Sequence, residues 1–234
     1  MWAILVAAGR GARMGGDLPK QYQLLAGKPI IERSLRALEA AQAVNGIMVV
    51  LGQNDEHWDK LKLRCSKPLK TVLGGAERAD SVLSGLDALA SECGKDDWVM
   101  VHDAARPCLD PALVDRLEAA LMGHPCGGLL AIPVRDTLKQ VREGEVVATL
   151  DRAQLWQAQT PQVYRYDLLR QALLQASDKG VQVTDETMAM ELAGYHPRIV
   201  EGAAGNIKIT VPEDMLLAEF LLDRAGMDPL ELDL

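Results

Sequence analysis

Three apolar runs without polar alternation recur along the chain, at residues 47–51, 98–101 and 128–132, and a fourth at residues 2–6 opens it. Short runs rich in Val, Leu and Ile are typical of strands buried on both faces. Between them, apolar residues recur at helical spacing. These positions are Ile31, Leu35 and Leu38, then Ala79, Val82, Leu86 and Leu89, then Leu113, Leu117 and Leu121 after Pro111. Alternating strands and helices predict an α/β fold with a Rossmann-like, mostly parallel sheet flanked by helices.

The pattern changes after Pro133. Residues 134–141 and 146–150 flank a turn-like stretch and predict a protruding antiparallel hairpin. Such a hairpin is marginally stable alone. We therefore interpret residues 134–152 as a β-arm for dimerisation within one domain that spans residues 1–234.

The rest of the chain is expected to continue the alternation. Its pattern predicts helices at 166–176 and 185–193, a strand at 207–211, and a last helix after Pro212. Thr210 and Glu213 have the spacing of a capping box for that helix.

Composition limits the classes of partner. The chain has 234 residues, is 48% hydrophobic, and carries a net charge of −8 with a pI near 5.1. This balance argues against nucleic acid or an anionic membrane as the main partner, but a local basic cluster can still hold a small anionic substrate. Four cysteines without C-x-x-C spacing indicate neither a zinc site nor a dithiol. The apolar start is too short for a membrane span, so we expect a cytoplasmic protein.

The first strand leads into a glycine-rich basic loop at residues 7–20. Its glycines let the backbone approach a ligand closely, and Arg10, Arg13 and Lys20 add cations, so the loop predicts a nucleotide-phosphate site. It is not a Walker loop, because Asp17 follows where that motif needs lysine. It is a poor dinucleotide fingerprint too, because Met14 stands where the third glycine belongs.

A second candidate lies at the end of the predicted strand 98–101, where Asp103 is followed by Arg106. The carboxyl ends of parallel strands line the ligand crevice of such sheets, so Asp103 is expected on the same side as the glycine-rich loop. A single carboxylate there suits Mg²⁺, which draws its other ligands from phosphate and water. His102, beside a buried strand, is interpreted as a structural residue.

Nine motifs occur together in an order that resembles the 2-C-methyl-D-erythritol 4-phosphate cytidylyltransferase family of the nonmevalonate isoprenoid pathway. They are LVAAGRGARMG at Leu5, PKQY at Pro19, GGAERADSV at Gly74, VHDAARP at Val101, PVRDT at Pro133, DR at Asp151, QTPQ around Thr160, TDE at Thr184 and NIKIT at Asn206. The resemblance covers nearly the whole chain.

The resemblance implies a role for each matching residue. Arg13 and Lys20 would stabilise charge on the reacting phosphates. The residues implied for CTP are Ala7, Ala8, Gly9, Gly75, Ser81, Asp103 and Ala104, with Asp103 holding Mg²⁺ or Mn²⁺. Those implied for the acceptor phosphate are Arg106, Thr137, Arg152, Thr184 and Lys208. The arm that carries Thr137 and Arg152 reaches across a homodimer in this family.

Two alternatives remain at this point. Ribitol-5-phosphate cytidylyltransferases share the loop, the aspartate strand and the Thr-Pro-Gln segment, but HDAARP and the surroundings of Asp151 favour the methylerythritol enzyme. A catalytically silent nucleotide-binding regulator could use the same fold. The joint presence of Arg13, Lys20, Asp103 and Lys208 argues against it, because binding alone does not require all four.

Overall fold

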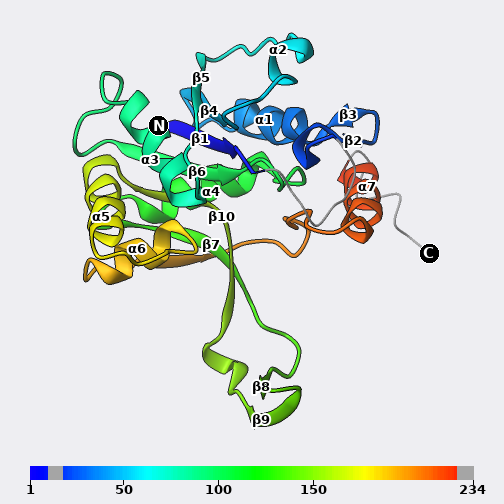
Figure 1. Ribbon diagram of the computed structural model, residues 1–234, viewed down its shortest axis with the longest axis vertical. Coiled ribbons are helices and arrows are strands. Elements are labelled where there is room, and N and C mark those ends of the chain that lie inside the picture. The colour runs from blue at the N-terminus through cyan, green and yellow to red at the C-terminus, as the bar shows by residue number, and fades with distance from the viewer. Residues whose placement is uncertain (10–17, 226–234) are drawn as a thin grey trace.

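The computed structural model describes residues 1–9 and 18–225, and its centre is a seven-stranded sheet in the order β11-β7-β10-β6-β1-β4-β5 (Figure 1). The strands are β1 (Trp2–Ala7), β4 (Gly46–Leu51), β5 (Leu69–Leu73), β6 (Trp98–Asp103), β7 (Gly127–Pro133), β10 (Trp156–Arg165) and β11 (Arg198–Glu201). β10 runs antiparallel to β6 and β7, and the other neighbouring pairs are parallel. The predicted α/β class with a mostly parallel sheet is confirmed.

Helices cover both faces of the sheet, which explains the unbroken apolar runs. The long helices are α1 (Ile30–Ala40), α3 (Arg78–Ala88), α4 (Pro111–Leu121), α5 (Tyr166–Asp178) and α7 (Glu213–Ala225), and α6 (Glu186–Leu192) is shorter. In β1, Ala3 and Leu5 pack with α1 and α4, whereas Ile4 packs with α3, α5 and α6. Successive strand residues point to opposite faces, so both sets of helices require apolar residues.

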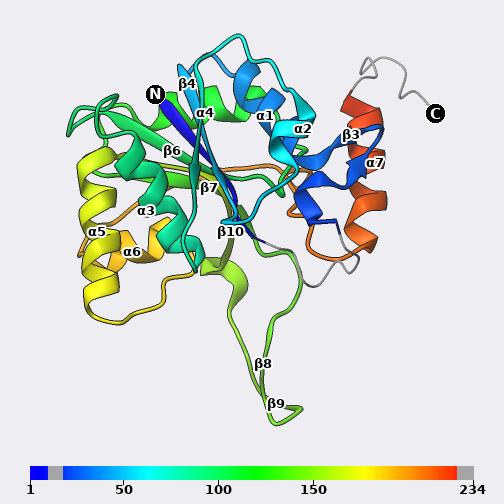
Figure 2. The same cartoon turned by 45° about the horizontal axis from the view of Figure 1, so that its top comes forward.

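A third apolar cluster attaches α7 to the opposite end of the molecule from α5 and α6, as both views show (Figures 1 and 2). It joins Ile209 and Ala218 to Leu25 and Ile30. The short elements near it and elsewhere are η2 (Lys20–Tyr22), β2 (Leu24–Leu25), β3 (Lys28–Pro29), α2 (Trp58–Leu61) and η3 (Arg152–Gln154).

The predicted antiparallel arm is present. β8 (Lys139–Arg142) and β9 (Glu145–Thr149) form a separate two-stranded sheet that extends away from the sheet and helices (Figures 1 and 2). Glu143 and Gly144 make the turn with φ of 51° and 86°. Left-handed conformations at both positions match the twist of a tight hairpin, and glycine adopts them without steric cost.

The expected strand at 207–211 is wrong. The segment forms no ladder in the described chain; instead Ile209 N donates to Ala105 O at 2.8 Å. Its alternating pattern arises because Ile209 is buried and Lys208 is not, while the backbone bonds to a loop rather than to a strand. β5, β10 and β11 were not expected from the pattern.

The expected capping box before α7 is also wrong. Asp214, rather than Glu213, accepts hydrogen bonds from Thr210 N at 2.7 Å and Val211 N at 3.0 Å. The Thr210 hydroxyl donates to Lys208 O at 3.1 Å. Pro212 lies between the two groups, and Asp214 lies close enough to reach back across it. Among the described helices, none is long and apolar enough to cross a membrane.

Replacing Leu35 with alanine should lower the free energy of unfolding by about 2–5 kcal/mol, because it leaves a cavity in a well-packed core. Leu35 is fully buried between α1 and the sheet, whereas Leu216 on α7 is 73% exposed. The matched control Leu216→Ala should change the free energy by no more than about 0.5 kcal/mol. Urea denaturation followed by circular dichroism measures both; equal losses would contradict the assigned core.

Candidate functional site

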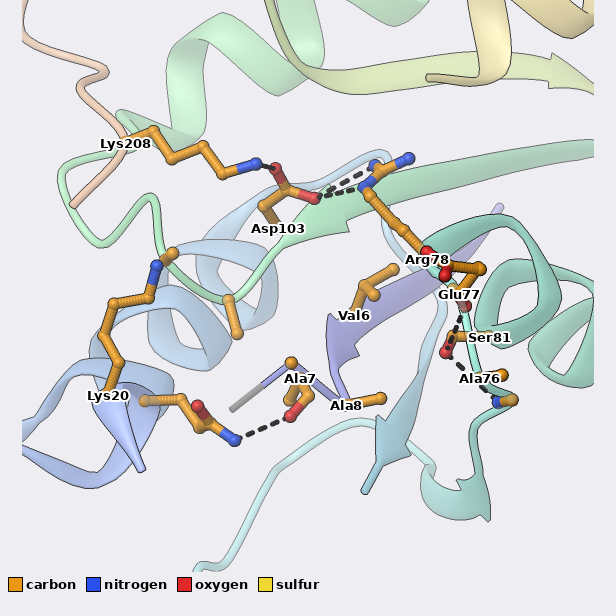
Figure 3. Close-up of a pocket in the computed structure, with 15 residues that line it drawn as sticks. Val6, Ala7, Ala8, Lys20, Ala76, Glu77, Arg78, Ser81, Asp103 and Lys208 are labelled. Carbon is orange, nitrogen blue, oxygen red and sulfur yellow. Dashed lines mark hydrogen bonds and ion pairs between the residues drawn. The ribbon is translucent and has the colours of Figure 1, made fainter. Parts of the chain in front are cut away.

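A cavity of about 350 Å³ opens where the parallel strands β1 and β6 end side by side at the centre of the sheet (Figure 3). Its lining residues are Val6, Ala7, Ala8, Gly9, Lys20, Gln21, Gly75, Ala76, Glu77, Arg78, Ser81, Asp103, Ala104, Ala105 and Lys208. The carboxyl ends of strands are the usual ligand position in open α/β sheets. Nine residues expected at the site from the sequence therefore meet here: Ala7, Ala8, Gly9, Lys20, Gly75, Ser81, Asp103, Ala104 and Lys208.

One wall of the cavity joins the end of β1 to η2. Gln21 Nε2 donates to Ala7 O at 2.7 Å (Figure 3). Lys20 Nζ donates to Ile209 O at 2.6 Å. These two bonds hold the Lys20 ammonium between the end of β1 and the segment that carries Lys208. Two cations from distant parts of the chain thus line one cavity.

The opposite wall is the tight turn between β5 and α3. Gly75 N donates to Ser81 Oγ at 3.2 Å, and that hydroxyl donates to Glu77 O at 3.1 Å. A Cβ at Gly75 would collide with the side chain of Asp80, so the turn requires glycine. The result is a close-packed backbone edge facing the cavity, as a ligand held by backbone groups needs.

Four charged side chains meet at one side of the cavity, and three of them line it. Asp103 Oδ2 lies 2.6 Å from Lys208 Nζ, and Asp103 Oδ1 accepts from Arg78 Nε at 3.0 Å (Figure 3). The same guanidinium donates to Glu186 through Nη1 to Oε1 at 2.6 Å and Nη2 to Oε2 at 3.1 Å. The Glu186 side chain is 1% exposed. Two buried carboxylates are therefore balanced by two cations.

This balance sets the protonation states. Burial by itself would raise the pKa of Asp103, but the charges of Arg78 and Lys208 outweigh it and hold that pKa well below its usual range. Burial likewise opposes the charged form of Arg78, yet Glu186 and Asp103 raise its pKa. Asp103 is thus an ionised carboxylate at neutral pH in the lining of the cavity.

A divalent cation fits this wall only with help from a ligand. No group of three or more His, Cys, Asp or Glu side chains suited to a metal occurs in residues 1–9 and 18–225. Asp103 is ionised and lines the cavity. Mg²⁺ often binds through one or two carboxylates and substrate phosphates. The residue set therefore fits a metal delivered with a nucleotide, for which Asp103 would supply the protein carboxylate.

Comparison with known proteins identifies the family. Residues 1–224 match the family model described as IspD: 2-C-methyl-D-erythritol 4-phosphate cytidylyltransferase. The chain belongs to this family. It is 50% identical over 230 residues to the 2-C-methyl-D-erythritol 4-phosphate cytidylyltransferase of Azoarcus sp. strain BH72, covering 97% of this chain and 96% of that protein. The enzyme of Pseudomonas aeruginosa strain UCBPP-PA14 is 50% identical over 218 residues, with 92% and 93% covered.

Solved structures agree with this family. A crystal structure of 4-diphosphocytidyl-2C-methyl-D-erythritol synthase superposes with a TM-score of 0.81 at 36% identity, covering 95% of this chain and 98% of that one. The Francisella tularensis 2-C-methyl-D-erythritol 4-phosphate cytidylyltransferase gives 0.80 at 34% identity, with 94% and 99% covered. The resemblance read from the nine motifs is confirmed.

Four other predicted site residues of this cytidylyltransferase lie outside the cavity lining. Arg106, Thr137, Arg152 and Thr184 are not among the residues that line the cavity, and Arg13 lies outside the described residues. Arg106 donates through Nη1 to Asn206 O at 2.7 Å, and its Nε is buried without a hydrogen-bond partner. Burial lowers the pKa of Arg106, and nearby Asp103 partly opposes this. Thr184 lies at the start of α6, and its hydroxyl contacts Met188 Sδ at 3.6 Å.

Sequence reasoning missed Arg78 and Glu186. Both stand inside motifs that carry the family resemblance, GGAERADSV and TDE. They are 108 residues apart, and the guanidinium of one lies against the carboxylate of the other. A charged residue inside a glycine-rich turn motif was the available signal, because the first turn of α3 faces the cavity.

A hydrogen-bonded chain fixes the end of β6. Asp103 N donates to Thr160 Oγ1 at 3.1 Å, and Thr160 Oγ1 lies 3.0 Å from His102 Nδ1. His102 Nε2 lies 3.2 Å from Arg106 O. These partners assign a neutral imidazole with its proton on Nε2, since the threonine hydroxyl must donate to Nδ1. His102 is fully buried, so its interpretation as a structural residue agrees with its contacts.

The buried His102 makes folding depend on pH. Burial lowers its pKa from 6.5 to about 4, so the unfolded chain binds its proton first and stability falls as pH drops below 6.5. Between about pH 8 and pH 5 this group alone should lower the free energy of unfolding by about 2 kcal/mol.

The test is urea denaturation at both pH values for the wild type and His102→Gln. The amide keeps a donor and an acceptor but does not titrate, so the pH dependence of the variant should be weaker by about that 2 kcal/mol. An identical pH dependence in both proteins would show that His102 is not the group responsible.

Proposed function

We propose that this chain transfers the cytidylyl group of CTP to 2-C-methyl-D-erythritol 4-phosphate and releases pyrophosphate, forming 4-diphosphocytidyl-2-C-methyl-D-erythritol. The observation that carries the proposal is one cavity in which Lys20, Lys208 and an ionised Asp103 meet, within a chain that belongs to the cytidylyltransferase family along residues 1–224. Lys20 and Lys208 are suited to bind the triphosphate of CTP and the phosphate of the acceptor, although the protein as a whole is negatively charged.

The proposed reaction needs positioning and electrostatic stabilisation rather than a protein nucleophile. A phosphate oxygen of the acceptor attacks the α-phosphorus of CTP in line, and the bond to the pyrophosphate leaving group breaks. Lys20, with Arg13, stabilises the charge that develops on these phosphates, and Lys208 binds the acceptor phosphate. No covalent enzyme intermediate forms.

The nucleotide is proposed to lie between the end of β1 and the turn after β5. Ala7, Ala8, Gly9 and Gly75 would contact cytidine through their backbone, next to the hydroxyl of Ser81 and the adjoining Ala104. Mg²⁺ or Mn²⁺ held by Asp103 would neutralise phosphate charge during transfer.

We further propose that the enzyme is a homodimer whose arms exchange. Val141, Val146 and Val147 on the hairpin are 55%, 61% and 51% exposed, which is unfavourable for an isolated two-stranded sheet. Arg152 and Thr137 lie at the base of this arm, outside the cavity of their own chain. In the dimer, Thr137 and Arg152 would contact an acceptor bound at the cavity of the partner subunit. Arg106 and Thr184, which lie outside the cavity lining, are proposed to contact the same acceptor.

A cytoplasmic location is part of the proposal. Cys65, Cys93, Cys108 and Cys126 are all free thiols. Unpaired cysteines are usual in a reducing compartment.

Purified protein incubated with CTP and Mg²⁺ should release pyrophosphate with 2-C-methyl-D-erythritol 4-phosphate and much less with ribitol 5-phosphate. Excess EDTA should abolish the release, and Mn²⁺ should restore it, because the proposed metal is held by Asp103 and by the phosphates of the nucleotide. A coupled pyrophosphate assay measures all arms. Preference for ribitol phosphate would assign the rival acceptor. CTP binding without turnover on either acceptor would assign a silent regulator, and full activity in EDTA would refute the metal.

Mixing two variants that have little activity at an acceptor concentration near the wild-type KM should restore activity if the arm acts in the partner. Lys20→Ala should lower turnover about 10²- to 10³-fold, because it removes a cation from the transferring phosphates. Arg152→Ala should mainly raise the KM of the acceptor. In an exchanged equimolar mixture, half the dimers are mixed and one of their two sites is complete, so about a quarter of wild-type activity should return.

The control pair is Lys20→Ala with Lys208→Ala. Both residues line the cavity of a single chain, so no mixed dimer has a complete site and activity should stay low. Restoration in neither mixture, after subunit exchange is demonstrated by mass spectrometry, would show that Arg152 does not act in trans.

A further inference from the structure

Arg78 lines the cavity, yet its guanidinium is occupied by two protein carboxylates. Its Nε and Nη2 lie 3.0 Å from Asp103 Oδ1, and its Nη1 and Nη2 bind the two oxygens of Glu186. A planar guanidinium held in this way by two carboxylates has a fixed orientation, which a lysine ammonium cannot reproduce.

Glu186 is itself held firmly. It is the first residue of α6, and the residues on either side of it are anchored to β10. Gln162 Nε2 donates to Asp185 Oδ2 at 2.9 Å, and Gln162 Oε1 accepts from Thr187 N at 3.0 Å. β10 therefore fixes the start of α6, and with it the carboxylate that orients Arg78.

The same strand also fixes the backbone at Asp103, through Thr160 Oγ1. The Asp103 side chain is thus supported from two directions, by its backbone bond to β10 and by the path from β10 through Glu186 and Arg78. Burying an ion pair removes both charges from water, and the free-energy cost of this desolvation largely cancels the attraction between them. The pair of Arg78 and Glu186 therefore adds little to the free energy of unfolding. A positional role explains why it is present.

We propose that Arg78 and Glu186 form a positioning pair that orients the Asp103 carboxylate for the nucleotide-bound metal, and that Glu186 acts without touching either substrate. This inference rests on the proposed function. It extends that site to α6. Thr184, two residues before the start of α6, is expected to contact the acceptor, so one ion pair would align the nucleotide and acceptor sides of the site.

The test uses the double variant Arg78→Met/Glu186→Gln in the full chain. Replacing both residues leaves no buried charge without a partner, because Asp103 keeps its ion pair with Lys208. The Tm of the double variant should therefore lie within a few degrees of the wild-type Tm. Arg78→Met alone leaves Glu186 uncompensated and should lower Tm by about 10 °C. If the pair is only structural, activity should recover together with stability in the double variant.

We expect the double variant to regain the stability that Arg78→Met loses, but not the activity. In the double variant kcat should stay about 10- to 100-fold below the wild type, and Mn²⁺ binding in the presence of CTP alone, measured by electron paramagnetic resonance, should weaken by a similar factor. Wild-type kcat and Mn²⁺ binding in the folded double variant would overturn the proposal. If the double variant does not fold, Arg78→Lys replaces it in the test. Lysine keeps the charge but lacks the planar guanidinium that binds both carboxylates, so kcat and Mn²⁺ binding should fall as in the double variant. Full activity in Arg78→Lys would overturn the proposal.

A matched control is the exposed pair of Arg170 and Asp87, 2.7 Å apart, which also joins α3 to another helix. Arg170→Met/Asp87→Asn should change neither kcat nor Mn²⁺ binding, because exposed ion pairs contribute little. The wild type run in parallel separates the two claims. If it releases no pyrophosphate, the proposed function fails, and the Mn²⁺ titration still decides whether the pair positions Asp103.

Discussion

An ionised carboxylate in the lining of the cavity is the constraint on which the site depends. Asp103 lies at the end of a central strand, where burial opposes its charge, and it stays ionised because Arg78 and Lys208 contact its two oxygens. Each cation in turn determines the place of a further segment. Arg78 requires the buried Glu186 at the start of α6, and Lys208 requires its segment to cross the end of β6. The electrostatic balance of one side chain thus brings α3, α6 and the segment before α7 to one cavity.

The antiparallel strand β10 provides the rigidity that this balance needs. It lies between β6 and β7, and its polar residues face inward where a parallel strand of this sheet would carry apolar ones. Thr160 and Gln162 are buried, and both are hydrogen-bonded to site-bearing elements. Buried polar groups are costly unless satisfied, and a satisfied network is specific in geometry. β10 therefore buries polar side chains instead of apolar ones, and their hydrogen bonds fix the positions of Asp103 and of the start of α6.

The two ends of the proposed reaction make different demands on the fold. The proposed nucleotide contacts come from the ends of buried strands and the first turn of α3, which are held by dense packing. Two of the proposed acceptor residues, Thr137 and Arg152, come from the arm, which extends away from that packing (Figure 1). A second subunit would both cover the exposed valines of the hairpin and complete the acceptor side, so one association would satisfy both requirements.

Local pattern alone determined the α/β class, the arm and most elements between residues 30 and 133, because periodicity reports how many faces of an element are buried. The ordered motifs determined the family and nine residues that meet at the cavity. Periodicity does not report what covers those faces. β10 was missed because its inward residues are polar, and the segment at 207–211 resembled a strand because one side of it is buried against a loop. The pairing of Arg78 with Glu186 depends on two helices that start beside the same strand end, and only the tertiary structure decides that approach.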